Sequence, residues 1–373
     1  MVKPIRVLIV DDSPLMRKLI RSFFSEAQDI EVVGTAMNGR FALQKMPSLQ
    51  PDVIILDLEM PEMNGLEFLK EKKKNFPEIP VIILSSVARR GAQVTMEAMA
   101  AGASDFFLKP AVENQAELKQ IGLQIAELVR AYGAQKRKQT PNSEPASEKI
   151  ALDLPSTLVA EALPQEREVI KRTPKRQPAT IEVIAIGIST GGPNALRQIF
   201  PLLSKDLKIP LLVVQHMPAG FTKEFALSLD RICPLEVKEA EDGDLIRPGR
   251  ILIAPGDRHL RVKQRPLARV IELDDSPPLN GHKPSVEILF ASVAEVYQNH
   301  ACALIMTGMG KDGAEAIGAV YEEGGLTLAQ DADSSIVFGM PRAAIARGYI
   351  HRIVSLTEIP EVLNGLNNKQ YLN

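Results

Sequence analysis

Short aliphatic runs alternate with longer segments of helical periodicity over the first third of the chain. The runs cover residues 5–10, 30–35, 53–56, 81–84 and 105–108, and helices are expected from Pro14, Gly39, Gly65, Gly91 and Glu113. Short apolar runs separated by helical segments predict parallel strands whose connecting helices cover both faces of the sheet. We therefore expect an α/β domain with a five-stranded parallel sheet over residues 1–132.

The same alternation resumes near residue 180. Apolar runs at 181–188, 211–215, 303–306 and 326–330 each end at small or polar residues. This pattern predicts a second α/β domain over residues 180–373, with a doubly wound, mainly parallel sheet and an antiparallel hairpin.

Residues 133–179 have a different composition. Six prolines fall there among polar and charged residues, at positions 141, 145, 155, 164, 174 and 178. This composition is typical of a flexible, extended linker. An apolar island at 156–163 is either a docking helix for a partner or a stretch of residual helicity in a solvated linker.

Composition narrows the class of protein. A length of 373 residues favours two domains, and a net charge of -2 gives no reason to expect nucleic acid as a partner. The two cysteines, Cys233 and Cys302, form neither a disulfide framework nor a metal-ligand cluster. Both cysteines lie in apolar contexts that suit buried thiols in a reducing compartment, so we expect a cytoplasmic protein. No apolar run approaches the roughly 20 residues of a membrane span, so we expect no direct membrane insertion.

Polar side chains follow the apolar runs of the first domain. They are Asp11, Asp12, Asp57, Ser85, Ser86 and Lys109. Because the carboxyl ends of parallel strands share one edge of a sheet, these groups should converge, and crowded carboxylates favour a bound Mg²⁺. Singly, each is an ordinary helix cap or loop acid; together they predict a phosphoryl acceptor, with Asp57 as the nucleophile and Ser85 and Lys109 stabilising the phosphoryl group.

These residues lie in segments 10–13, 56–65, 84–86 and 107–110, which resemble the response-regulator receiver family over residues 4–132. The resemblance implies a flavodoxin-like fold and phosphorylation by a histidine kinase. The site residues that it implies are Asp57 for phosphorylation, Asp11, Asp12, Asp57 and the Glu59 backbone for Mg²⁺, Ser85 for the switch and Lys109 for contact with the phosphoryl group.

In the second domain, the run 181–188 stops at Ser189 and the glycines 191 and 192, where a helical pattern begins. Gly187-Ile188-Ser189-Thr190-Gly191 fits G-x-S-x-G, a strand-to-helix turn that exposes a nucleophilic hydroxyl. Two alternatives exist for the turn alone: Ser189 or Thr190 caps the helix, or the loop binds a phosphate.

Two further strand ends carry the partners of a serine nucleophile. His216 follows the run 211–215, and Asp312 lies in the glycine-rich turn after 303–306. This predicts a Ser-His-Asp arrangement in which Asp312 orients His216 and His216 takes the proton of Ser189. The rivals are His259 and His282 as histidines that line the cleft and Asp331 as the acid, whereas His300 and His351 are expected to be structural or solvated. The order serine, histidine, acid differs from that of α/β-hydrolases.

The sequence segments around these residues resemble those of the chemotaxis receptor methylesterase family. They are segments 186–192, 215–218, 254–259, 284–286 with 289–290, and 307–313. The resemblance implies Ser189 as nucleophile, His216 as base, Asp312 as its orienting partner and the Met309 backbone N–H as an oxyanion donor. Lys283 departs from the arginine usual in the family, which weakens any inference about substrate recognition there.

That resemblance also implies hydrolysis of glutamate methyl esters on chemotaxis receptors, deamidation of receptor glutamines, and a receiver that covers the cleft until Asp57 is phosphorylated. It implies no cofactor in the second domain. Two alternatives remain at this point. The second domain is a binding module in which Gly191 and Gly192 cradle a nucleotide phosphate, or it is a hydrolase of small esters.

Overall fold

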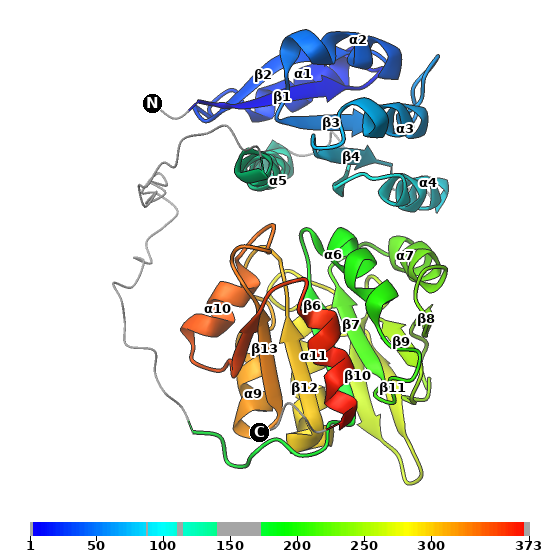
Figure 1. Ribbon diagram of the computed structural model, residues 1–373, viewed down its shortest axis with the longest axis vertical. Coiled ribbons are helices and arrows are strands. Elements are labelled where there is room, and N and C mark those ends of the chain that lie inside the picture. Colours follow the sequence, from blue (N-terminus) through cyan, green and yellow to red (C-terminus); the bar gives the residue numbers. More distant parts are fainter. Residues whose placement is uncertain (1–2, 87–88, 110–114, 140–172, 369–373) are drawn as a thin grey trace.

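The structure is a computed structural model that describes residues 3–86, 89–109, 115–139 and 173–368. It contains two α/β sheets that belong to separate layers of the molecule (Figure 1). The predicted α/β class is confirmed for both halves. Most of the predicted linker, including the island at 156–163, lies outside the described residues.

The first sheet has five parallel strands in the order β2-β1-β3-β4-β5. The strands are β1 (Ile5–Val10), β2 (Ile30–Ala36), β3 (Val53–Asp57), β4 (Val81–Ser85) and β5 (Asp105–Leu108). Strands β3 and β4 are buried along their whole length, as expected for a sheet with helices on both faces. Asp57 and Ser85 are the last residues of their strands, so the sheet itself holds them.

In the described part of the first domain, five helices cover this sheet. They are α1 (Pro14–Phe23), α2 (Gly39–Leu49), α3 (Gly65–Asn75), α4 (Arg89–Ala100) and α5 (Gln115–Gln139). Helix α3 begins at a capping box in which Asn64 and Glu67 each accept a hydrogen bond from the other's backbone N–H. Helix α5 continues past Tyr132, so its last turns extend into the segment predicted as linker.

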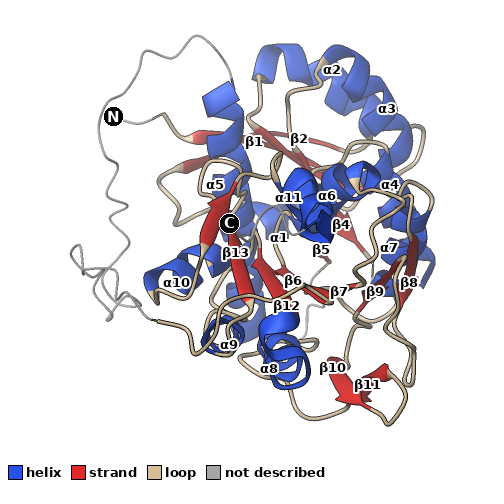
Figure 2. Ribbon diagram, turned by 60° about the horizontal axis from the view of Figure 1, so that its bottom comes forward, coloured by secondary structure: helices blue, strands red, loops and turns tan. Residues whose placement is uncertain are grey.

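The second sheet has seven strands in the order β14-β13-β12-β6-β7-β9-β8, all parallel. The strands are β6 (Val183–Ile188), β7 (Leu211–Gln215), β8 (Glu236–Glu239), β9 (Arg250–Ile253), β12 (Ala301–Ile305), β13 (Leu326–Gln330) and β14 (Arg352–Val354). The predicted hairpin is present as β10 (His259–Gln264) and β11 (Arg269–Asp274), which pair antiparallel and stand apart from the main sheet (Figure 2).

The helices of this half are α6 (Gly192–Ile199), α7 (Phe221–Asp230), α8 (Val286–Tyr297), α9 (Ala316–Glu322), α10 (Met340–Ala346) and α11 (Ile359–Gly365). From β6 the chain moves to β7 on one side and later returns to β12 on the other side of β6. The strand order therefore reverses between β6 and β12. In open α/β sheets this reversal leaves a crevice at the carboxyl ends of the strands, where ligands bind.

The end of the predicted linker and the first domain both contact the second domain. Residues 175–179 lie along the second domain, where the Lys175 and Ala179 N–H groups donate to Glu322 and Asn299 carbonyls. Helix α4 packs against α7, and the ring of Phe106 on β5 stacks on Phe221 at 5.2 Å between centroids.

Within the described ranges, no helix has both the length and the apolar character needed to cross a membrane.

Candidate active site

Ser189 lies directly after β6, at the reversal of strand order. Gly191 has φ +78°, and a β-carbon at position 192 would lie 2.0 Å from Gln215 Oε1. These glycines are therefore required by backbone conformation and by packing against Gln215. Gly191 occupies the helix cap with no side-chain hydrogen bond, so neither Ser189 nor Thr190 caps α6.

The three predicted catalytic side chains meet at the crevice. His216 Nδ1 lies 3.1 Å from Ser189 Oγ, and His216 Nε2 lies 2.8 Å from Asp312 Oδ2. With the proton on Nε2 donated to Asp312, Nδ1 is free to accept the hydroxyl proton of Ser189. The imidazole thus bridges a hydroxyl and a carboxylate, which is the geometry of an activated serine nucleophile.

Asp312 is almost fully buried, at 1% exposure. Its carboxylate accepts hydrogen bonds from Ser285 Oγ at 2.7 Å and from the Val286 N–H at 2.7 Å, in addition to the one from His216. Burial alone would raise its pKa, but these hydrogen bonds and the attraction of His216 hold the pKa below the ordinary value. Asp312 therefore stays ionised beside the His216 imidazole, at the N-terminus of α8.

The rival residues have other partners. His259 is buried behind the site, where its Nδ1 accepts from the Ser285 N–H and its Nε2 donates to the Pro277 carbonyl. Asp331 accepts from the backbone and hydroxyl of Ser334. His300 and His351 contact Thr180 and Thr327, as structural residues would.

His282 does line the cleft, as one of the alternatives held. Its ring stacks on His216 with 3.9 Å between centroids. Ser189, His216, His282 and Met309 border a cleft of about 710 Å³. Lys283, the residue that departs from the family pattern, directs its ammonium to the Asp275 carbonyl at 2.8 Å.

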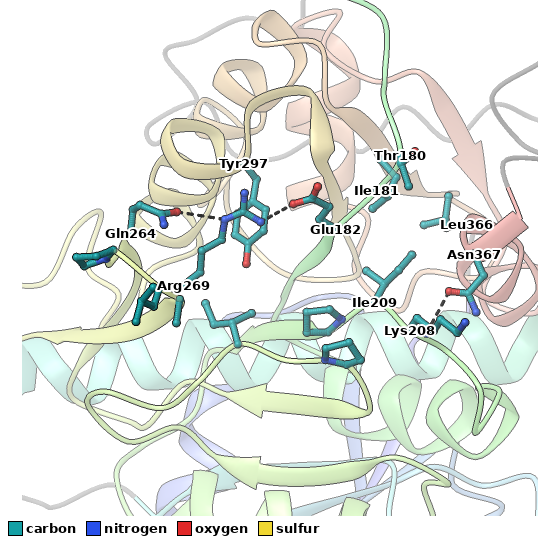
Figure 3. A pocket seen from close by; sticks show the side chains of 16 residues that line it. Thr180, Ile181, Glu182, Lys208, Ile209, Gln264, Arg269, Tyr297, Leu366 and Asn367 are labelled. Carbon is teal, nitrogen blue, oxygen red and sulfur yellow. Dashed lines mark hydrogen bonds and ion pairs between the residues drawn. The ribbon is translucent and has the colours of Figure 1, made fainter.

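A hollow of about 780 Å³ lies at the opposite ends of the strands (Figure 3). Its lining includes Glu182, Arg269 and Tyr297, where Arg269 pairs with Glu182 and lies over the Tyr297 ring. These groups are already engaged with one another. The hollow holds none of the convergent nucleophile, base and acid of the cleft, so its greater volume does not make it the reactive site.

The acidic edge of the first sheet also forms as predicted. One ligand atom from each of Asp11, Asp12 and Asp57 lies within 4.8 Å of the others. Lys109 Nζ lies 2.8 Å from Asp57 Oδ2 and 3.4 Å from Asp11 Oδ2. Burial raises the pKa of both Asp11 and Asp57 despite this ammonium.

The donor set of this edge fits a hard divalent cation. Among the described residues, the buried Asp11 Oδ2 has only the ion pair with Lys109 at 3.4 Å, and the charge of Asp11 disfavours that of Asp57. Oxygen ligands with room for water are those that Mg²⁺ prefers. Glu59 contributes its backbone beside this edge, where its N–H donates to Asp57 Oδ1 at 3.4 Å.

Ser85 connects this edge to helix α4 of the first domain. Its hydroxyl lies 2.6 Å from Thr95 Oγ1, and Thr95 belongs to α4. Because α4 packs against α7, a change at Ser85 has a physical route to the second domain.

The first domain covers the cleft. Residues of the first domain on β5 and α5 line it together with Ser189 and His216. The carboxylate of Asp105 accepts a hydrogen bond from the Gly191 N–H at 2.9 Å. Ile336 of the second domain packs against the apolar core of the first. The nucleophile turn is therefore held by a group from the other domain.

Burial raises the pKa of Asp105 to about 6, although the Gly191 and Phe106 amides and the Tyr132 hydroxyl donate to it. The strand-end criterion missed this residue because it stands at the start of β5. The available signal was a carboxylate opening an otherwise apolar strand, Asp105-Phe106-Phe107-Leu108. Ser285, which holds Asp312, was likewise not predicted.

Comparisons with known proteins agree with this organisation. Residues 184–363 match the model of the CheB methylesterase family, and residues 7–121 match that of the response regulator receiver domain. The protein-glutamate methylesterase/protein-glutamine glutaminase of Treponema denticola is 54% identical over 365 residues, which cover 96% of this chain and 97% of that protein. The chain belongs to this methylesterase family. The predicted family and the prediction of a hydrolase are thereby confirmed.

Other relatives of the methylesterase family extend the comparison. The protein of the same description from Treponema pallidum is 49% identical over 389 residues and covers 96% of each chain. The solved catalytic domain of the Thermotoga maritima CheB methylesterase is 42% identical, covers 50% of this chain and all of that one, and has a TM-score of 0.49. The similarity to full-length methylesterases spans both halves of the chain.

Proposed function

We propose that this protein hydrolyses the γ-methyl esters of glutamates on chemotaxis receptors and deamidates selected receptor glutamines, using Ser189, His216 and Asp312. The observation that supports this proposal most directly is the position of the His216 ring. Its two nitrogens lie 3.1 Å from Ser189 Oγ and 2.8 Å from Asp312 Oδ2. The named activities of its full-length relatives supply the substrate class.

The reaction follows from where protons and charges can go. Ser189 Oγ attacks the ester carbonyl while its proton passes to His216 Nδ1, and Asp312 stabilises the imidazolium. His216 then protonates the leaving group, which is methanol from an ester or ammonia from an amide. Water, activated by the same imidazole, attacks the acyl-enzyme and restores the serine and a glutamate.

The negative charge on the carbonyl oxygen needs donors that are already in place. The Met309 backbone N–H is our candidate, because Met309 borders the cleft beside Ser189 in the glycine-rich turn after β12. A β-carbon on Gly308 would lie 2.8 Å from Ser189 Cβ, so the close approach of this turn to the nucleophile requires glycine.

The receiver supplies the control. We propose domain limits of 1–132, 133–179 and 180–373, with phosphorylation of Asp57 by the chemotaxis histidine kinase. Asp11, Asp12, Asp57 and the Glu59 backbone would hold Mg²⁺. This ion neutralises charge on the transferring phosphoryl group when bound. Lys109, at 2.8 Å from Asp57, is placed to contact the same group.

Phosphorylation opens the cleft in this account. The Ser85 hydroxyl leaves Thr95 for the new phosphoryl oxygens, which changes the packing of α4 against α7. The contacts of Asp105 and Phe106 with the second domain then separate and expose Ser189 to a receptor. The cytoplasm, where such a kinase and receptor region meet, is the proposed location.

The test is methanol release from membranes that contain methylated receptors. We expect the wild-type chain to release methanol and Ser189→Ala to lose that release by at least about a thousandfold. Release that survives in Ser189→Ala would contradict the mechanism. Turnover of a small ester at equal efficiency without receptor would instead favour the small-ester hydrolase.

The binding-module alternative is weakened by the glycines of the turn. Gly192 is accounted for by its packing on Gln215, and its N–H is already bonded to the Ser189 carbonyl at 2.8 Å within the second domain. A phosphate cradle would need such amides to converge on free space.

A further inference from the structure

His282 lies face to face with the proposed base. Its ring is 3.9 Å from that of His216 between centroids, with 6° between the planes. Ser189 and Asp312 contact the two nitrogens at the edge of the His216 ring. Two hydrogen bonds in the plane of a ring leave it free to rock about the line that joins the nitrogens. A second ring stacked on the face removes that freedom.

The chain holds His282 in a tight turn. Leu279 and His282 exchange backbone hydrogen bonds of 3.1 and 2.9 Å. Asn280 and Gly281 between them have φ of 53° and 79°, both in the left-handed region. An Asn-Gly pair with positive φ at both positions is the sequence of a type I′ turn, which is a well-defined hairpin geometry.

The same segment also secures the acid. Ser285, three residues after His282, donates its hydroxyl to Asp312 Oδ1, and the next N–H, of Val286, donates to Oδ2. Residues 279–286 thus restrain the face of the imidazole at one end and the carboxylate at the other. This is more than packing around a cleft requires.

The charge state of His282 suits this position. Burial, with a further contribution from His216, lowers the pKa of His282 to about 4. The ring is therefore neutral at the pH at which His216 accepts the serine proton. A neutral aromatic face over the resulting imidazolium is favourable, whereas a second cation at this separation would repel it.

We propose that His282 is a positioning residue, whose neutral ring holds the plane of His216 so that Nδ1 stays directed at Ser189 Oγ. The inference rests on the proposed function, because it assigns His282 a role through the proposed base. This role requires an aromatic ring at position 282 for full activity and does not require the ring nitrogens.

Two substitutions separate ring from nitrogen. His282→Phe keeps a flat neutral ring, and His282→Gln keeps a polar side-chain nitrogen without a ring. In the full chain with methylated receptor membranes, we expect kcat to fall about two- to threefold for His282→Phe and at least about tenfold for His282→Gln, with KM changed by less than about twofold. The matched control is His300→Phe, at the opposite ends of the strands, with wild-type kcat expected. Thermal unfolding of each variant reports folding.

The reverse order, with His282→Gln more active than His282→Phe, would overturn the proposal and assign the ring nitrogens a direct contact with substrate. Equal, wild-type activity of both variants would overturn it as well. Ser189→Ala in the same assay distinguishes a failure of the proposed function from a failure of the role assigned to His282. Activity in that variant refutes the proposed function, whereas an inactive Ser189→Ala with an unaffected His282→Gln refutes only the role of His282.

Discussion

Two buried aspartates approach the nucleophile turn, and they differ in how they are held. Asp312, inside the second domain, bonds to an imidazole, a hydroxyl and the amide at the start of α8, and its pKa is lowered. Asp105, from the receiver, bonds to the Gly191 and Phe106 amides and a tyrosine hydroxyl without a cationic partner, and burial raises its pKa to about 6.

In the proposed mechanism, this difference separates a contact that stays in place from one that is released when the cleft opens. A carboxylate whose charge is stabilised by its surroundings serves catalysis best by staying where it is. A carboxylate whose charge is penalised by burial gains solvation when its domain departs. The same residue type therefore suits an orienting acid in one setting and a releasable contact in the other.

The largest expected effect is on the permanent acid. Asp312→Asn keeps the shape of the side chain but removes the charge that orients and stabilises the His216 imidazolium. We expect kcat for methanol release to fall by about 10³ to 10⁴. The companion variant Asp105→Asn should retain turnover. A loss of less than about tenfold in Asp312→Asn would show that Asp312 does not orient the base.

Removing the cover is the next strongest change. Deletion of residues 1–140 takes away β5, α5 and the Asp105 contact with Gly191. We expect basal methanol release to rise by about ten- to a hundredfold, within the range of ordinary coupling between sites. A fall in activity would argue instead that the receiver activates the second domain by contact.

A single contact should account for part of that effect. Asp105→Ala leaves the Gly191 N–H without its buried acceptor when the domains are closed, which destabilises the closed form. We expect unphosphorylated activity to rise about tenfold, with a smaller further gain on adding a phosphodonor. Circular dichroism of the variant checks the receiver fold. Unchanged basal activity would remove Asp105 from the closing contacts.

The smallest expected effect is on pH dependence. The pKa of Asp105 is about 6 when buried against the ordinary 3.8. The closed form thus binds the proton more tightly, is favoured at low pH, and loses that advantage as pH rises through 6. Between pH 5 and 7 we expect the open to closed ratio, measured by X-ray scattering, to rise about five- to tenfold. Asp105→Asn should flatten this dependence; an equally steep profile in that variant would assign it to another group.

Residues that meet because of their position in a sheet could be predicted from the sequence. Ser189, His216 and Asp312 each follow an apolar run, and parallel strands bring their carboxyl ends to one edge, so their convergence could be predicted. The acidic edge with Asp57 and Lys109 was predictable for the same reason. Residues at these strand ends need only the topology to meet.

The roles of residues whose position depends on packing between distant segments could not be predicted from the sequence. Asp105 reaches Gly191 only because the two domains are docked, and no local pattern encodes that docking. The stacking of His282 depends on a turn whose placement over His216 is set by the rest of the domain. Ser285 stands at the N-terminal end of α8, but its hydroxyl donates to Asp312 and makes no hydrogen bond to the helix backbone.

The most direct test of a receiver-gated serine esterase is methanol release from methylated receptor membranes with and without Mg²⁺ and a small phosphodonor. The wild-type chain is compared with Ser189→Ala and Asp57→Asn. We expect the phosphodonor to raise release by the wild type, to leave the basal release of Asp57→Asn unchanged, and to elicit no release from Ser189→Ala. Stimulation of Asp57→Asn equal to that of the wild type, or release by Ser189→Ala, would contradict it.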